Sequence, residues 1–234
     1  TVAGRTFDLF GYNQTVTDLT MGRGNLCNRN RPGGSSSTLN VRGQITYTGQ
    51  TSLSSAGNAM SAALIYAGPD EDSPPTTLTV NLLGPTTFDI ADGPQTPDMA
   101  FGGNWYLDAD NDYYVAITGT GNTPITKKGP GFLQFKSSAK NMFAGDITIE
   151  DGTFHGIVSL IDAGPFGDAA NNVCLTRNGT ISFGGGLAGS SNTLANATFA
   201  GGNKWRCNIG NNVDINLASL ARAGGSRGTL MLGG

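Results

Sequence analysis

Residues 141–154 read NMFAGDITIEDGTF, and this stretch indicates how the chain is built. The aromatic Phe143 leads through Ala-Gly-Asp into a short Ile-Thr-Ile run, a Glu-Asp-Gly turn and a new start at Thr153. Successive side chains of a strand point to opposite faces, so Ile147 and Ile149 are predicted to share a buried face with Phe143. The pattern fits either one hairpin or one unit of a repeat.

Similar phrases recur along the chain at intervals of roughly twenty residues, the spacing of solenoid repeats. Each has Gly or Thr, then Thr, then an apolar-polar-apolar run and a turn with Gly. Examples are TTLTVNLLG from Thr76, TTFDIADG from Thr86, GFLQF from Gly131, GTISFGGG from Gly179 and GTLMLGG from Gly228. A single short turn cannot bury a core, so such units must stack on one another. The sequence predicts an all-β β-solenoid, with a β-sandwich or jelly roll as the alternative.

The composition favours strands over helices. Of 234 residues 36 are Gly, and only 13% are charged, which suits short strands and tight turns better than helices. Two weak helical candidates remain, residues 53–66 and 214–225, and AALIY at the end of the first reads equally well as a buried strand. We expect one solenoid domain over residues 1–234, with protruding loops at 66–75 and 104–114.

Charge and cysteine content narrow the function classes. The net charge is −3 with scattered basic residues, which argues against a nucleic-acid groove, and no apolar run is long enough to span a membrane. The chain begins in strand-like sequence without a signal peptide, so we expect a segment or processed subunit of a larger surface protein. Three separated cysteines predict no zinc site; they are either buried small side chains or include one Cys174–Cys207 bridge.

Residues 117–154 resemble the repeat of a known protein family. ITGTGNTPITKKGPGFLQFKSSAKNMFAGDITIEDGTF is similar to the autotransporter-associated β-strand repeat, also called the passenger-associated transport repeat. The shared positions are Gly119, Gly121, Ile125, Lys127, Gly129, Gly131, Leu133, Phe135, Asn141, Phe143, Gly145, Ile147, Ile149, Gly152, Thr153 and Phe154. Asp146 departs from the usual Gly or Thr. Residues 4–24 and 162–185 resemble neighbouring phrases of the same family, whereas 50–75 and 186–225 are poorly covered.

The resemblance implies a single-stranded right-handed parallel β-helix of a secreted or surface-displayed bacterial protein. Members are typically stalks, fibres or adhesin segments and not enzymes, and we expect about ten rungs of roughly 20–25 residues. Both ends of a solenoid expose unpaired backbone and an apolar cross-section, which predicts end-to-end self-association into filaments. Other surface proteins or glycans are further expected partners. The rival hypotheses are a polysaccharide-degrading enzyme on a β-helix and a phage spike or capsid-associated β protein.

An acidic loop is the one candidate metal site. Asp108, Asp110 and Asp112 alternate in DADNDYY, as carboxylates do at the start of a calcium-binding loop. The EF-hand pattern then fails, because Tyr113 stands where Gly is needed and Gly119 where Glu is needed. We therefore expect no required cofactor, with calcium as a weak candidate and a solvated turn as the alternative.

Aromatic side chains around the acidic loop form a candidate contact surface, either for sugars and proteins or for packing of the loop itself. They are Trp105, Tyr106, Tyr113 and Tyr114. No catalytic constellation is visible around the single histidine, His155. Carboxylates are available for glycosidase chemistry, but nothing in the sequence pairs them; they are Asp108, Asp110, Asp146, Glu150, Asp151 and Asp168. Asn13, Asn178 and Asn196 lie in glycosylation sequons.

Overall fold

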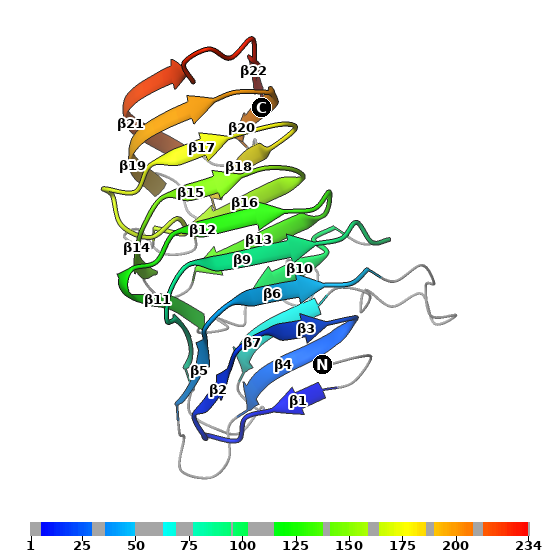
Figure 1. The fold of residues 1–234 in the computed structure, drawn as a ribbon. Helices are drawn as coiled ribbons and strands as arrows, with labels where there is room; N and C mark the ends of the chain where they lie inside the picture. Colours follow the sequence, from blue (N-terminus) through cyan, green and yellow to red (C-terminus); the bar gives the residue numbers. More distant parts are fainter. Residues whose placement is uncertain are drawn as a thin grey trace.

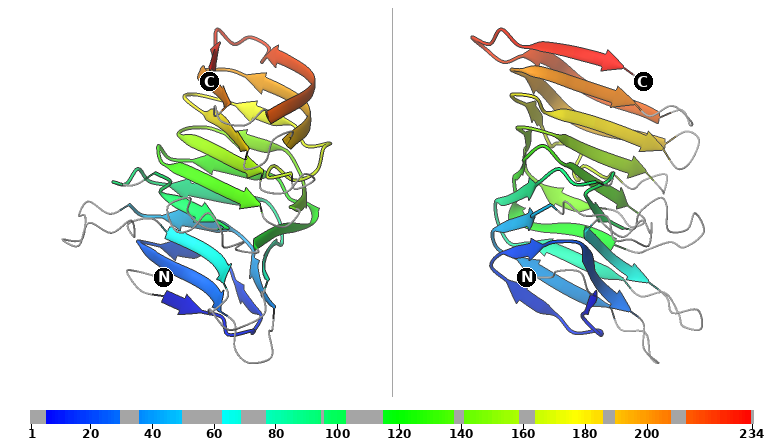
Figure 2. Two further views of the ribbon diagram at one scale, coloured as in Figure 1. Left: turned by 180° about the vertical axis from the view of Figure 1, so that it is seen from behind. Right: turned by 90° about the vertical axis from the view of Figure 1, so that its right-hand side faces the viewer.

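The computed structural model describes residues 6–29, 36–49, 63–68, 77–94, 96–102, 115–137, 141–158, 164–185, 190–207 and 213–233. This part of the chain is all-β: 22 strands form three parallel sheets, and it contains no helix (Figure 1). The chain rises from β1 at one end of a stack to β22 at the other (Figure 2). The all-β prediction is confirmed.

The two longer sheets run the length of the stack. In spatial order, the nine-stranded sheet contains β1 (Thr6–Asp8), β4 (Gly24–Arg29), β7 (Ala63–Gly68), β10 (Met99–Phe101), β13 (Phe132–Ser137), β16 (Thr153–Val158), β18 (Thr180–Gly185), β20 (Gly202–Cys207) and β22 (Thr229–Gly233). The eight-stranded sheet contains β3 (Leu19–Met21), β6 (Gln44–Tyr47), β9 (Thr86–Ile90), β12 (Ile125–Lys128), β15 (Ile147–Ile149), β17 (Val173–Leu175), β19 (Ser190–Phe199) and β21 (Val213–Arg222).

The third sheet is shorter. It contains β2 (Gln14–Val16), β5 (Ser37–Val41), β8 (Leu78–Leu82), β11 (Val115–Asn122) and β14 (Met142–Ala144). From β2 to β16 the chain visits the five-, eight- and nine-stranded sheets in turn, and from β17 it alternates between the two longer ones. This parallel stacking is compatible with a β-helix. A sandwich or jelly roll is built from antiparallel neighbours, which the described strand pairs are not.

The opening stretch is one rung of this stack. Ile147 pairs in parallel with Ile125 of the preceding rung and with Val173 of the following one. Phe143, Ile147 and Ile149 are fully buried, as predicted. The turn that follows needs glycine, because Gly152 has a φ of 67° and a Cβ there would lie 2.5 Å from the carbonyl oxygen of Gly131.

Aromatic side chains stack through the interior from rung to rung, with neighbouring ring centroids 4.7 to 5.8 Å apart. Most neighbours meet edge to face, the arrangement that aromatic quadrupoles favour. We call this set the inner aromatic row, and its members are Phe88, Phe101, Phe135, Phe154, Phe166, Phe183 and Trp205. The row joins rungs that are distant in sequence into one core.

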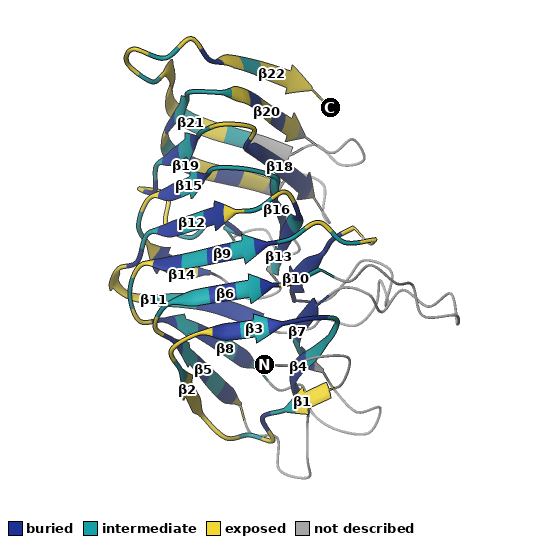
Figure 3. Cartoon of the chain, turned by 45° about the vertical axis from the view of Figure 1, so that its right-hand side comes forward, coloured by how far each residue is buried: buried dark blue, intermediate teal, exposed yellow. Residues whose placement is uncertain are grey.

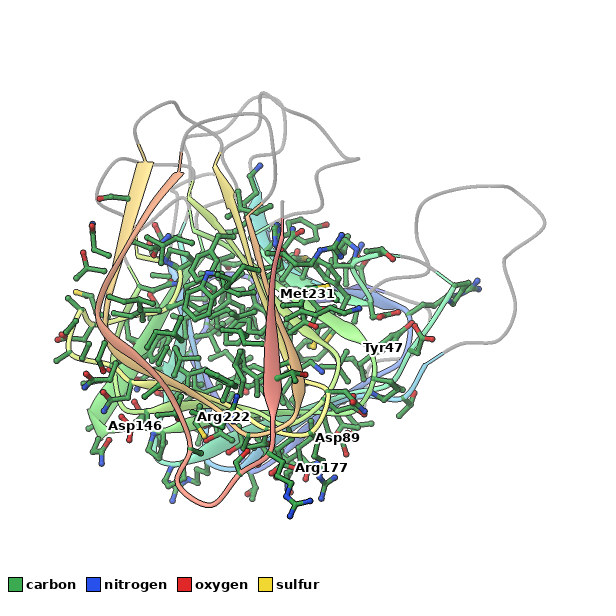
Figure 4. The ribbon with its side chains drawn as sticks, turned by 90° about the horizontal axis from the view of Figure 1, so that it is seen from above. Tyr47, Asp89, Asp146, Arg177, Arg222 and Met231 are labelled. Atoms are coloured by element: carbon green, nitrogen blue, oxygen red, sulfur yellow. The ribbon has the colours of Figure 1, made fainter. Side chains whose placement is uncertain are left out.

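Polar side chains form matching ladders on the outside. The first outer ladder runs over the five-stranded sheet and consists of Thr15, Asn40, Asn81 and Thr118. The second outer ladder consists of Asp146, Asn172, Asn196 and Ser219, at intervals of 26, 24 and 23 residues. Its hydrogen bonds are 2.7 to 2.9 Å long, and Asp146 lies at the outer margin of the stack viewed from above (Figure 4). These intervals are close to the predicted rung length of roughly 20–25 residues. Earlier rungs are longer, because Ile45 is in register with Phe88 and Phe88 with Lys127, so the prediction is wrong for that part of the stack.

The helical candidate at 214–225 is wrong. Residues Val213–Arg222 form β21, which pairs with β19 along its length. Ile215 and Leu217 both pack against the core, so the two-residue alternation of a strand overrides the loose helical spacing. Of the first candidate, residues 63–66 belong to β7, which is the strand alternative. Residues 53–62 lie outside the described residues.

The predicted loops, the predicted disulfide and the question of a membrane span remain. Tyr66 to Gly68, the start of the expected loop at 66–75, lie in β7; residues 69–75 and 104–114 lie outside the described residues. Cys174 is not part of a disulfide, so the Cys174–Cys207 bridge is not formed. In the described ranges there is no helix long and apolar enough to cross a membrane.

Candidate functional site

A groove of about 890 Å³ lies where the five-stranded sheet ends. Four parts of the chain form its walls: the end of β11, β14, the turn Gly164–Ala169 and the start of β19. The groove therefore opens on the side of the stack, at the rung after which the chain no longer returns to the five-stranded sheet.

Amide side chains hold the turn against β14. The Nδ2 group of Asn171 donates to the carbonyl oxygens of Phe143 and Phe166, at 3.2 and 3.0 Å. Its Oδ1 accepts from the backbone N–H of Gly145 at 2.8 Å. Gly167 has a φ of 76° and passes so close to Phe143 that a Cβ would lie 2.5 Å from that carbonyl oxygen. The turn is thus fixed by hydrogen bonds and close packing.

Asparagine side chains also form the floor of the groove. Asn141 is buried and fully engaged: its Oδ1 accepts from Ile117 N–H at 2.9 Å, and its Nδ2 donates to the Pro165 carbonyl at 3.2 Å. Asn192 is 3% exposed, and its Nδ2 has no hydrogen-bond partner. Among the buried side chains described, this is the one polar atom left unpartnered.

The rim of the groove is polar and carries little charge. Ser191, Thr193 and Asp168 are exposed and line it. Met142, on β14, contributes an apolar side chain that is 60% exposed. Asp168 is the one charged side chain among the described lining residues. The groove therefore offers hydroxyl, amide and carboxylate groups beside one apolar contact.

A buried lysine is the most unusual titratable group of the interior. Lys127 is fully buried and faces inward on β12, where it pairs in register with Phe88 and Ile149. Its Nζ donates to the carbonyl oxygens of Lys128, Gly129 and Asp151, at 2.8, 2.7 and 3.1 Å. Burial lowers the pKa of the amine to about 8, against the opposing charges of Asp151, Asp89 and Asp98.

Two further groups with shifted pKa values lie near this lysine. Burial, opposed by hydrogen bonds from Phe132 and Gly93, raises the pKa of Asp98; both backbone N–H groups donate to its carboxylate at 2.7 Å. Burial and then the charge of Asp98 raise the pKa of Tyr47 to about 12. Shifted pKa values often mark active sites, but Tyr47, Asp98 and Lys127 are inaccessible. Asp98 and Lys127 bind backbone groups, so we interpret the cluster as a structural bracket.

His155 contacts a serine, which the sequence did not predict. Its Nδ1 lies 2.9 Å from the Oγ of Ser182 on the neighbouring strand. Burial lowers the pKa of His155 to about 4, so the imidazole is neutral at pH 7. A catalytic dyad needs an accessible serine and a group that orients the base, whereas both side chains here are buried. The contact links two rungs.

The predicted metal and contact residues remain predictions. Asp108, Asp110 and Asp112, and the aromatic residues Trp105, Tyr106, Tyr113 and Tyr114, lie outside the described residues. Asp146 belongs to the second outer ladder, Asp151 accepts from the N–H of Gly152, and Asp168 lines the groove. In the described ranges no three acidic, His or Cys side chains are placed to hold a metal ion.

Neither the buried Lys127 nor Asn192 was predicted from the sequence, and the reasons differ. The Ile-Thr-Lys alternation from Ile125 does place Lys127 on the inner face, so an inward lysine was open to prediction. No sequence pattern marks Asn192, because its position beside the groove depends on which rung lacks a strand of the five-stranded sheet. Comparisons of the chain with protein-family models, curated proteins and solved structures found no match.

Proposed function

We propose that the chain is a single-stranded right-handed parallel β-helix and serves as a structural segment of a secreted or bacterial surface protein. Support comes from the strictly parallel strand pairing and from stacking that continues through the inner aromatic row. Right-handed crossovers are strongly preferred between parallel strands. The role is that of a fibre, stalk or adhesin segment.

The observation that carries this proposal is the exposure of apolar side chains on the two terminal strands, β1 and β22; Figure 3 shows exposed residues on both strands. At one end, Phe7 on β1 is 50% exposed. At the other, Met231 and Leu232 on β22 are 63% and 67% exposed. Each of these strands lies at an edge of the nine-stranded sheet. Exposed strand edges with apolar side chains favour pairing with a further strand.

The apolar interior is incompletely covered at the β22 end of the stack. In the middle rungs the inward side chains are fully buried, for example Phe88 and Ile149. In the last rungs Ile215, Leu217 and Leu230 are only partly buried although they pack against the same core. Another rung stacked on this end would bury these three side chains. We propose that a second copy of the chain supplies that rung and that the copies form end-to-end filaments.

The test is the size and shape of the purified chain. We expect negative-stain electron microscopy to show filaments, and light scattering to show a mass that grows with concentration. The double variant Met231→Lys, Leu232→Lys places charge on the terminal coil and should stop growth. Met142→Lys, which adds charge to an exposed side chain on the flank, is the matched control and should assemble normally. A strictly monomeric wild-type particle would refute end-to-end assembly.

The enzyme and phage-spike hypotheses remain predictions without a specific observation in their favour. Of the candidate carboxylates, Asp146 bonds within the second outer ladder, Asp151 accepts from a turn N–H, and Asp168 lines the groove as its one described charged side chain. Glycoside hydrolysis requires two carboxylates that flank the same sugar bond. The structural role is therefore the function that we put forward.

A further inference from the structure

A charged side chain, Arg222, stands at the end of an inward-facing column in the last rung. Side chains in register on neighbouring strands form such a column, and below Arg222 it contains Phe199, Leu175, Ile149 and Lys127. Leu175 and Ile149 belong to the buried core, so Arg222 occupies an inward position. It is nevertheless exposed, and viewed from above it lies between β21 and β22, inside the outline of the stack (Figure 4).

The guanidinium group of Arg222 rests on an aromatic ring. Its Cζ lies 5.9 Å from the centroid of the Phe199 ring, within the range of a cation–π contact. Apolar side chains of the same rung are also exposed: Leu220 on β21 by 44% and Leu232 on β22 by 67%. The cation–π contact therefore places a positive charge among the apolar side chains that end the core.

The other basic side chain of this column shows what an inward charge requires. Lys127 is fully buried, and its Nζ donates to the carbonyl oxygens of Lys128, Gly129 and Asp151. Two of these acceptors come from its own turn, and the third comes from the following rung. A guanidinium group has five N–H donors, and burial of an unpaired charge is strongly unfavourable. Arg222 thus opposes coverage by any rung that brings no acceptor to it.

The first rung of a second copy brings an apolar side chain to this position. Leu19 on β3, at the free edge of the eight-stranded sheet, belongs through Ile45 to the same column as Arg222. In a second copy stacked in the same register, Leu19 would therefore cover the guanidinium group. The carboxylate next to it, that of Asp18, is exposed and already accepts from the backbone N–H of Gln44 at 2.8 Å.

We propose that Arg222 is a gatekeeper of the β22 end: it opposes the addition of a second copy and sets the concentration at which copies join. The apolar side chains of the last rung favour the contact, and removal of the guanidinium group from water opposes it. Inward-pointing charges are one means by which proteins protect the edges of their sheets. This role rests on the contact between copies proposed above and adds the residue that limits it.

The experiment measures the assembly threshold, the concentration at which light scattering by the whole 234-residue chain begins to rise. Negative-stain electron microscopy shows whether the scattering particles are filaments. Arg222→Leu removes the charge and keeps an apolar side chain, so it should lower the threshold about tenfold or more. Arg222→Lys keeps the charge and should assemble at the wild-type concentration.

Arg206→Leu is the matched control. Arg206 is exposed on β20 next to the inward-facing Trp205, so this variant removes the same charge from the outer face, one rung earlier. It should leave the assembly threshold unchanged, which separates the position of Arg222 from the net charge of the chain. Circular dichroism below the threshold shows that each variant is folded.

The outcomes separate the gatekeeper role from end-to-end assembly itself. Wild-type filaments with an unchanged or higher threshold for Arg222→Leu would overturn the gatekeeper role and leave assembly standing. An equal fall of the threshold in Arg206→Leu would also overturn it. A wild-type chain that stays monomeric while Arg222→Leu forms filaments would support the gatekeeper role and refute assembly of the natural chain. If neither protein assembles, both proposals are overturned.

Discussion

Side chains contact one another from rung to rung both inside and outside the stack, but different forces hold the two sets together. The inner aromatic row is buried, with ring centroids as close as 4.7 Å between Phe135 and Phe154. The second outer ladder has hydrogen bonds of similar regularity, but Asn196 and Ser219 are exposed to water. Burial of apolar area stabilises strongly, whereas exposed hydrogen bonds contribute little net energy. The inner aromatic row is therefore expected to stabilise the fold far more than the second outer ladder does.

The largest expected effect is at the centre of the inner aromatic row. Phe135 contacts the rings of Phe88, Phe101 and Phe154, and truncation leaves a cavity between rungs. Phe135→Ala should reduce the free energy of unfolding by about 3–5 kcal/mol, measured by urea denaturation. A loss below about 1 kcal/mol would mean that the row contributes no more than a surface position.

Acid should weaken the contact between His155 and Ser182. The pKa of His155 in the folded chain is about 4, below the ordinary value of 6.5, so between these values the unfolded chain binds a proton that the folded chain does not. The free energy of unfolding should therefore fall as the pH drops from 6.5 toward 4, by at most about 3 kcal/mol. His155→Gln should remove this slope in denaturation curves, and an unchanged slope would assign it to other groups.

Lys127 should make the free energy of unfolding depend on pH in the alkaline range. The pKa of its amine in the folded chain is about 8, against an ordinary value of 10.5, so the unfolded chain binds more protons between these values and the free energy of unfolding should rise with pH. The pKa of Tyr47 is about 12, above its ordinary value of 10, so this group makes the free energy of unfolding fall above pH 10. The measurement is therefore made between pH 8 and 10.

Lys127→Met should abolish that alkaline rise. At pH 7 it should also cost about 1–3 kcal/mol, because three buried carbonyl oxygens lose their donor. Thermal melts of both proteins across the same pH series provide the measurement. Identical pH profiles would show that the amine titrates normally.

The smallest effect is expected on the second outer ladder. Asn172 donates to Asp146 and accepts from Asn196, both at 2.9 Å. Asn172→Ala removes both bonds at a solvated site and should cost about 0.5–1 kcal/mol, measured by the same urea titration as Phe135→Ala. A cost equal to that of Phe135→Ala would erase the contrast between inside and outside.

The repeated local pattern made much of the fold predictable. The alternation at Ile147 and Ile149, the buried Phe143 and the glycine turn at Gly152 follow from sequence alone and are confirmed. The groove was not predictable, because it arises where the chain stops returning to the five-stranded sheet after β14. That depends on lengths between strands and on packing of distant rungs, and neither leaves a mark in the sequence around Asn192.

The direction of the hydrogen bonds has a mechanical consequence. Strands in all three sheets lie across the stack, so the bonds that join rungs run along its long axis (Figure 1). A force that pulls the two ends apart along this axis loads the bonds of one rung at a time, as in opening a zipper. Each rung joined by the second outer ladder, 23 to 26 residues long, would then release roughly 80–90 Å of extended chain. Under tension the molecule should lengthen in steps that begin at the partly buried rungs near β22 and become longer at the rungs that contain Ile45 and Phe88.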